Sequence, residues 1–195
     1  MSSEDTSFPQ LVSLACHDLR TPLATIYGFS RTLTRMSDLG EPATSYLAMV
    51  ERASQQLGEL LDELTLAARI RGDRYDPERR AVDTLALAES ARERLGYDRV
   101  EVHGPGGQVS LDADATPRAV SALAQCALRH GGLERVTVTA DGPEIRIEPI
   151  TPASAPVVLG RELRDLGAAV GVLVIETLGG SVTLEGETLV VRLPV

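Results

Sequence analysis

The sequence has few residues of the types that build disulfide frameworks and metal sites. It contains only two cysteines, Cys16 and Cys126, which lie far apart and have no second pair of ligands at metal-binding spacing. Its three histidines, His17, His103 and His130, are scattered along the chain. We therefore expect no disulfide framework, no metal site and no bound cofactor, and we expect both cysteines to be small buried side chains.

Basic residues and long apolar runs are also scarce. Lysine and arginine together number 19 against 28 acidic residues, which gives a net charge of -9. This charge repels the phosphates of nucleic acids and anionic lipids, so we expect no nucleic-acid partner. No apolar run approaches the ~20 residues of a membrane-spanning helix, and the polar, acidic residues 1–9 are unlike a signal peptide. We therefore expect a cytoplasmic protein without membrane attachment.

The first third of the chain shows the spacing of two long helices. Apolar residues recur at alternating intervals of three and four, and the polar, glycine- and proline-containing segment 36–42 interrupts the pattern. This predicts two helices that pack along one heptad seam as a hairpin. The seam residues are Val12, Ala15, Leu19, Pro22, Ile26, Phe29 and Leu33, then Tyr46, Val50, Ala53, Leu57, Leu60, Leu64 and Ala67.

A lone hairpin of this length would leave apolar residues beside the seam in water. We therefore predict that residues 1–74 form a dimerisation domain, in which two copies of the chain make a four-helix bundle as a homodimer. The flanking apolar residues that suggest the second copy are Leu11, Leu14, Leu23, Leu47, Met49 and Leu61.

The heptad register also places a chemically distinctive group on the outer face of the first helix. With Val12 at position a, His17 falls at position f, which is farthest from the seam and faces solvent. Arg20 and Thr21 follow one turn later on the same face, and Asp18 is the neighbour of His17 around the helix. The register thus displays a nucleophile, a carboxylate, a cation and a hydroxyl together.

The seven residues His17-Asp18-Leu19-Arg20-Thr21-Pro22-Leu23 resemble the H-box of two-component histidine kinases, which lies on the first helix of their dimerisation and phosphotransfer domain. The resemblance implies that His17 accepts a phosphoryl group, that Asp18 orients and stabilises its ring, and that Thr21 helps to hydrolyse a phosphorylated partner. Imidazole suits this role because its reference pKa of ~6.5 leaves a neutral, nucleophilic ring near neutral pH.

The rest of the chain, residues 80–195, has the order of elements of a small α/β sandwich and more weakly resembles the Bergerat-type ATPase domain of the same kinases. The predicted fold class is therefore α+β. We expect Thr116 to cap the second helix of this domain. The expected helices span 83–95, 116–130 and 162–178, and the expected strands span 99–103, 109–111, 136–139, 145–148, 181–185 and 189–193.

The nucleotide-binding motifs of that family are degenerate here. The segment 123–130 resembles the N-box, but Cys126 stands where the family has the asparagine that binds magnesium, and a soft thiol suits that hard cation poorly. The glycine-rich motif that contacts adenine is absent near 148–152, and only Gly160 remains of the lid before Gly167. We therefore predict that ATP binding is lost and that magnesium acts only on a partner receiver domain.

A phosphoryl acceptor without ATP must be charged by another protein. The lidless second domain is similar to that of the Spo-zero-B and ChpT groups, which relay phosphate between receiver domains. The prediction is therefore a histidine phosphotransferase whose partners are response-regulator receiver domains. We expect Arg20, Leu23 and Tyr27, together with the second helix, to form the recognition surface.

Two alternatives remain open, so the sequence does not decide whether the chain is an enzyme. The first is a divergent or truncated sensor histidine kinase; the missing magnesium ligand and lid weigh against it, and with only 16 residues before His17 we expect no sensor domain in cis. The second is a non-catalytic scaffold that binds receivers, in which His17 is a relic.

Overall fold

The chain divides into two compact units, one ending at Tyr75 and one beginning at Asp76. The computed structural model describes residues 3–35 and 40–194. The first unit is helical, whereas the second combines strands and helices. The division into domains at residues 1–74 and 80–195 stays a prediction.

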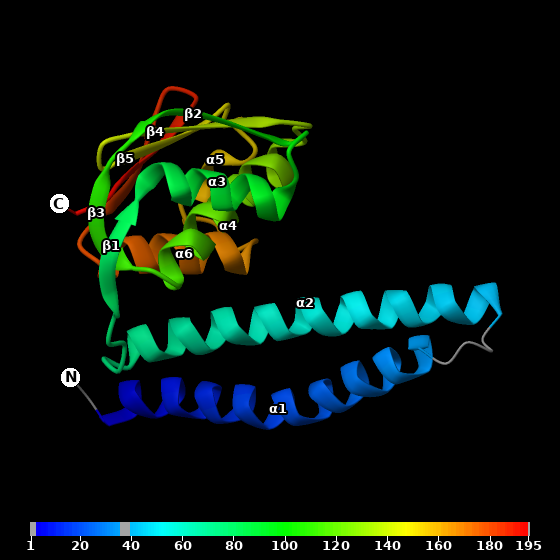
Figure 1. Ribbon diagram of the computed structural model, residues 1–195. Helices are drawn as coiled ribbons and strands as arrows, with labels where there is room; N and C mark the ends of the chain where they lie inside the picture. The colour runs from blue at the N-terminus through cyan, green and yellow to red at the C-terminus, as the bar shows by residue number, and fades with distance from the viewer. Residues whose placement is uncertain (1–2, 36–39, 195) are drawn as a thin grey trace. The chain divides into compact units, whose positions relative to one another are not determined.

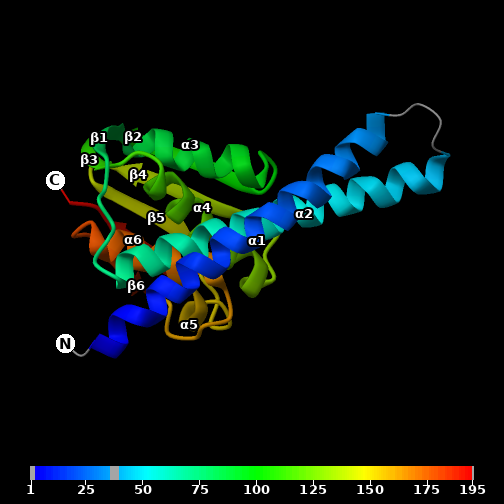
Figure 2. The same cartoon turned by 90° about the horizontal axis from the view of Figure 1, so that it is seen from below.

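The first unit is a hairpin of two long antiparallel helices, α1 (Ser3–Arg35) and α2 (Glu41–Arg71), which lie side by side in both views (Figures 1 and 2). Ion pairs connect them in antiparallel register: Arg20 Nη2 lies 2.8 Å from Asp62 Oδ1, and Arg31 Nε lies 3.5 Å from Glu51 Oε1. Within the described ranges 3–35 and 40–194, no helix has both the length and the apolar character required to cross a membrane.

The faces that pack inside the hairpin are not the ones predicted. Large apolar side chains of the predicted seam remain 37–67% exposed, whereas residues at heptad spacing on the adjacent face, four of them small, are buried or half-buried. Small side chains let the two backbones approach, so the predicted arrangement of the faces was wrong. The exposed residues are Leu19, Ile26, Phe29, Leu33, Tyr46, Val50, Leu57, Leu60 and Leu64. The covered residues are Cys16, Leu23 and Ser30 on α1 and Leu47, Ser54, Leu61 and Ala68 on α2.

The second unit is built on a five-stranded sheet of order β2-β4-β5-β7-β6. Its strands are β2 (Val100–Gly106), β4 (Val136–Asp141), β5 (Glu144–Glu148), β7 (Thr188–Arg192) and β6 (Ser181–Glu185); β2 and β4 are parallel and the other neighbours antiparallel. A separate antiparallel pair joins β1 (Arg79–Asp83) to β3 (Gln108–Asp112).

Helices α3 (Thr84–Leu95), α4 (Ala115–Gly131) and α6 (Leu166–Thr177) cover one face of this sheet, as Figure 1 shows, and α5 (Ala155–Val158) is a single turn. The core lies between helices and sheet, because the alternating strand residues that face the helices are fully buried. Ile145, Ile147 and Val138 from the sheet and Leu87 and Leu123 from the helices are each at most 1% exposed.

The predicted α+β class is confirmed, but two helix starts differ from the prediction. Helix α4 begins at Ala115, so Thr116 is not its cap; the Asp112 carboxylate accepts the N–H groups of Asp114 and Ala115 instead. Helix α6 begins at Leu166 rather than near 162, because the side chain of Asp165 accepts the Ala168 N–H at 3.0 Å and fixes the first turn. Strand β1 and the turn α5 are additional elements.

Candidate functional site

His17 lies in the first half of α1 and its side chain is exposed, as its place at heptad position f predicts. Its chain neighbour Cys16 is 1% exposed, so the helix backbone next to the exposed imidazole is held by a buried side chain. Thr21 is exposed one turn later on α1. The side chain of Asp18 lies outside the described part of the structure, so its predicted contact with His17 stays a prediction.

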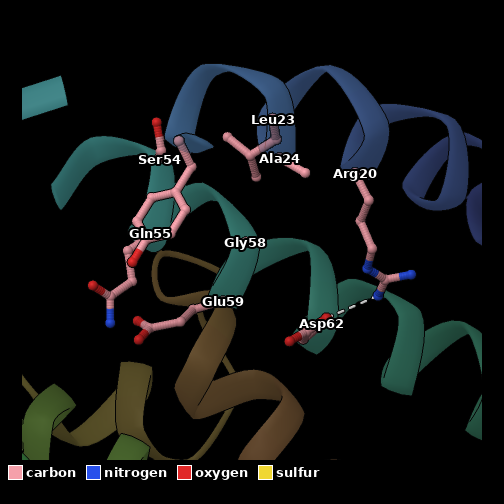
Figure 3. A pocket seen from close by; sticks show the side chains of 9 residues that line it. Arg20, Leu23, Ala24, Ser54, Gln55, Gly58, Glu59 and Asp62 are labelled. Carbon is pink, nitrogen blue, oxygen red and sulfur yellow. Dashed lines mark hydrogen bonds and ion pairs between the residues drawn. The ribbon is translucent and has the colours of Figure 1, made fainter. Parts of the chain in front are cut away.

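The three residues predicted to recognise a partner gather at one groove of the helical hairpin. Arg20, Leu23 and Tyr27 line it from α1, as Figure 3 shows for Arg20 and Leu23. The groove has a volume of about 440 Å³ and begins one turn from His17. The residues that line it from α2 are Ser54, Gln55, Gly58, Glu59 and Asp62, with Ala24 completing the α1 side.

The groove combines a fixed cation with an apolar floor. The Arg20 guanidinium donates to Asp62 Oδ1 at 2.8 Å and to Thr65 Oγ1 at 3.1 Å, so its position is set by α2 before any partner arrives. A β-carbon on Gly58 would lie 3.8 Å from Leu23 Cδ2, which shows that the leucine lies over the bare backbone of α2. Such a mixed, preorganised surface suits a protein partner, because little side-chain entropy is lost on docking.

A second cluster of reactive groups lies in the α/β unit, between the end of α4 and the start of α6. Cys126 and His130 are one turn apart on α4, and Asp165 precedes α6. His130 Nε2 lies 3.2 Å from Asp165 Oδ2, and Cys126 Sγ is within 4.8 Å of a ligand atom of each of the two residues. Burial, and then the negative charge of Asp165, raise the pKa of the Cys126 thiol to about 12, so it is protonated near neutral pH.

This cluster occupies the place where the N-box resemblance puts the magnesium ligand. The donors present are one sulfur, one imidazole nitrogen and one carboxylate, whereas magnesium in nucleotide sites prefers oxygen ligands only. The connection from β5 to α6 contains α5 and a turn in which the N–H groups of Arg161 and Glu162 both donate to the Pro156 carbonyl. Those two amides are therefore already occupied and do not face a phosphate.

Asp165 is the member of this cluster that sequence reasoning missed. The spacing of Cys126 and His130, four residues apart on a predicted helix, was a signal that the two side chains share a face. Nothing in the sequence brings in a residue 35 positions beyond His130. Only the packing of α4 against α6 joins the carboxylate to the pair.

Comparison with known proteins agrees with this architecture. Residues 10–73 match the His Kinase A (phospho-acceptor) domain, and this range contains His17. Over 216 residues, covering 92% of the chain and 36% of the relative, the sequence is 28% identical to the histidine protein kinase DivJ of Caulobacter vibrioides. The chain is a histidine-kinase-like protein. It is also 32% identical over 115 residues to the probable sensor histidine kinase TcrY of Mycobacterium tuberculosis.

The α/β unit of this histidine-kinase-like protein has a known fold as well. The crystal structure of full-length ShkA in complex with AMPPNP superimposes with a TM-score of 0.67 over 94% of this chain and 44% of ShkA, at 20% sequence identity. The predicted order, a helical phospho-acceptor region followed by a domain with the histidine-kinase ATPase fold, is thereby confirmed. The chain spans 23% of TcrY and 36% of DivJ.

Proposed function

We propose that this histidine-kinase-like protein is a histidine phosphotransferase of a two-component phosphorelay, and that His17 passes a phosphoryl group between receiver-domain aspartates without ATP as the donor. The observation that carries the proposal is the contrast between the two units. The phospho-acceptor region presents an exposed His17, whereas the thiol of Cys126 stands at the position expected of the magnesium ligand.

The proposed transfer is a displacement at phosphorus. A neutral ring nitrogen of His17 attacks the phosphoryl group of a receiver aspartate; the N–P bond forms as the bond from phosphorus to the aspartyl oxygen breaks, and the carboxylate leaves on the receiver. The reverse step delivers phosphate to a second receiver. Asp18, by resemblance, accepts the N–H of the other ring nitrogen and stabilises the positive charge that develops. Magnesium is supplied by the receiver.

The groove beside His17 is the proposed docking surface for the receiver. Arg20 is held by Asp62 and Thr65, and Leu23 and Tyr27 provide apolar contact area next to it. Docking there places a partner within one helical turn of the imidazole, so recognition and transfer occur on the same face of α1. The role of Thr21, exposed on this face, would be to orient water when the phosphorylated receiver is hydrolysed.

The proposal also includes a homodimer. The exposed apolar residues of α1 and α2 form a face that a second hairpin would cover, giving the four-helix bundle expected of a phospho-acceptor domain. Position f of His17 lies away from this face, so the imidazole stays accessible in such a dimer.

The proposal is tested by measuring the transfer of a radiolabelled phosphoryl group to the purified protein. Receiver domains charged with labelled acetyl phosphate should transfer label to the chain within minutes, whereas labelled ATP with magnesium should transfer none. His17→Gln should abolish the label, and His103→Gln, which removes an exposed imidazole from β2, should retain it. Label from ATP alone would establish a divergent kinase, and label from neither donor would establish a scaffold.

A further inference from the structure

We infer that Cys126, His130 and Asp165 form a binding site for a borderline-soft divalent transition-metal cation, with Zn²⁺ as the probe that tests it. The inference concerns the α/β unit alone and does not depend on phosphotransfer through His17. It departs from the expectation that the chain holds no metal, since Asp165, the third ligand, is visible only in the folded structure.

The geometry of the cluster is close to that of a tetrahedral site. Typical zinc–sulfur, zinc–nitrogen and zinc–oxygen distances imply ligand-to-ligand separations of about 3.3–3.6 Å. His130 Nε2 and Asp165 Oδ2 already lie 3.2 Å apart. Cys126 Sγ lies within 4.8 Å of a ligand atom of each residue, so coordination would require the sulfur to move closer by rotation of its side chain. A cation would then replace the hydrogen bond between His130 and Asp165.

The burial of the ligands favours a cation over the empty cluster. Cys126 is fully buried, and its thiol has no hydrogen-bond partner among the described residues. The side chains of His130 and Asp165 are only 16% and 12% exposed. Bound to a divalent cation, the thiolate and the carboxylate would balance its charge, so the buried site would be neutral. A water molecule would complete the tetrahedron as the fourth ligand.

The second oxygen of Asp165 gives the site a rigid support. Asp165 Oδ1 accepts the Ala168 N–H at 3.0 Å and so fixes the carboxylate at the N-terminus of α6. This hydrogen bond leaves Oδ2 as the ligand atom and orients it toward α4, in the way that outer hydrogen bonds position metal-ligating carboxylates. A bound cation would therefore clamp the end of α4 to the start of α6 and stabilise the unit.

The donor set selects among metals. Sulfur and imidazole ligands favour Zn²⁺ and Co²⁺, whereas magnesium and calcium require several oxygens. Coordination must displace the proton of the Cys126 thiol, so the apparent affinity for metal should rise with pH. The site would thus differ in chemistry from the magnesium site of nucleotide-binding kinases, although the N-box resemblance puts it at a corresponding place.

The test is a titration of the chelator-treated full chain with Co²⁺ and then Zn²⁺. One equivalent of Co²⁺ per chain should produce the near-ultraviolet band of a thiolate-to-cobalt bond; Zn²⁺ should abolish this band, whereas excess Mg²⁺ should not. Zn²⁺ should also raise the Tm of the wild-type chain. No stoichiometric binding, or binding without the thiolate band, would overturn the inference.

Matched variants locate the ligands. Cys126→Ser should lose the thiolate band, and His130→Gln should weaken Zn²⁺ binding by at least about tenfold, equivalent to ~1.4 kcal/mol. His103→Gln and Cys16→Ser should bind as the wild type does. Thermal unfolding without metal identifies any variant that fails to fold. If Cys126→Ser or His130→Gln fails to fold, the Asp165→Asn variant tests the site instead, because its side chain can still cap α6. It should bind Zn²⁺ more weakly than the wild type does. Equal affinity in all folded variants would rule the site out.

Discussion

Cys126 is a single residue whose surroundings set its chemistry. Its thiol is fully buried on α4, where burial and the nearby carboxylate of Asp165 raise its pKa to about 12. An asparagine there would offer an oxygen to magnesium, but a neutral thiol offers none. The cluster that Cys126 forms with His130 and Asp165 is therefore one of mixed sulfur, nitrogen and oxygen donors.

The raised pKa predicts a loss of stability at alkaline pH. The ordinary pKa of a cysteine is 9.0, so above pH 9 the unfolded chain loses the thiol proton while the folded chain retains it. The stabilising contribution is complete below pH 9 and is lost as the pH rises toward about 12, with a slope of ~1.4 kcal/mol per pH unit. The free energy of unfolding in urea, measured in chelator from pH 8 upward, should show this decline.

The Cys126→Ala variant is the control, because it removes the titrating group. Its free energy of unfolding should fall less steeply than that of the wild type. The sequence favours a clear result, since all 19 basic residues are arginine and no lysine titrates in this range. Parallel curves for the two proteins would show that Cys126 does not titrate as inferred.

At the scale of elements, the carboxylate of Asp83 connects the start of helix α3 to the turn between strands β2 and β3. Asp83 ends β1 and caps α3: its Oδ1 accepts the Leu85 N–H at 2.9 Å and the Gly107 N–H at 3.3 Å. The glycine lies between β2 and β3, so the cap also holds the β2–β3 turn. Helix starts in this unit therefore depend on carboxylates that also serve a second contact.

Asp83→Ala should destabilise the protein by about 1–2 kcal/mol, because the cap of α3 and its contact with Gly107 are lost together. Urea unfolding followed by circular dichroism measures the change. Asp83→Asn keeps a capping oxygen and should lose less than half as much. If both variants were as stable as the wild type, the cap would contribute nothing measurable.

Several elements could be predicted from local sequence, and the failures have a physical cause. The helix over 83–95 and the strands near 136 and 145 follow from the local pattern of apolar and polar residues. Strand β1 was missed because its five residues do not alternate between buried and exposed positions. The segment is a strand because it pairs with β3. The start of α6 was misplaced because Asp165 competes with the earlier polar residues as its cap.

At the scale of the molecule, the helical hairpin has a large exposed apolar face. Large apolar side chains such as Phe29 and Leu57 are 67% and 53% exposed on α1 and α2. Burial of one such side chain contributes roughly 1.5–3 kcal/mol, so a second hairpin that covered this face would be strongly stabilised. The proposed dimer therefore follows from the same residues that the sequence pattern assigned to the inside of one hairpin.

Leu57→Glu should dissociate the proposed dimer, because it places a charge in each half of a buried apolar interface. Size-exclusion chromatography with light scattering measures the mass. Gln55→Glu introduces the same charge two residues away, on the groove face, and should remain dimeric. A dimer that persists in Leu57→Glu would place the interface elsewhere.

The sequence by itself determined the helical hairpin, the α+β class and the outward position of His17, because heptad spacing and the alternation of apolar residues are written in consecutive residues. The tertiary structure decided which face of the hairpin packs inside, since small residues at Ser30, Ser54 and Ala68 allow close approach and large ones do not. It also decided that Asp165 joins Cys126 and His130, because a contact between distant segments arises only when α4 and α6 pack together.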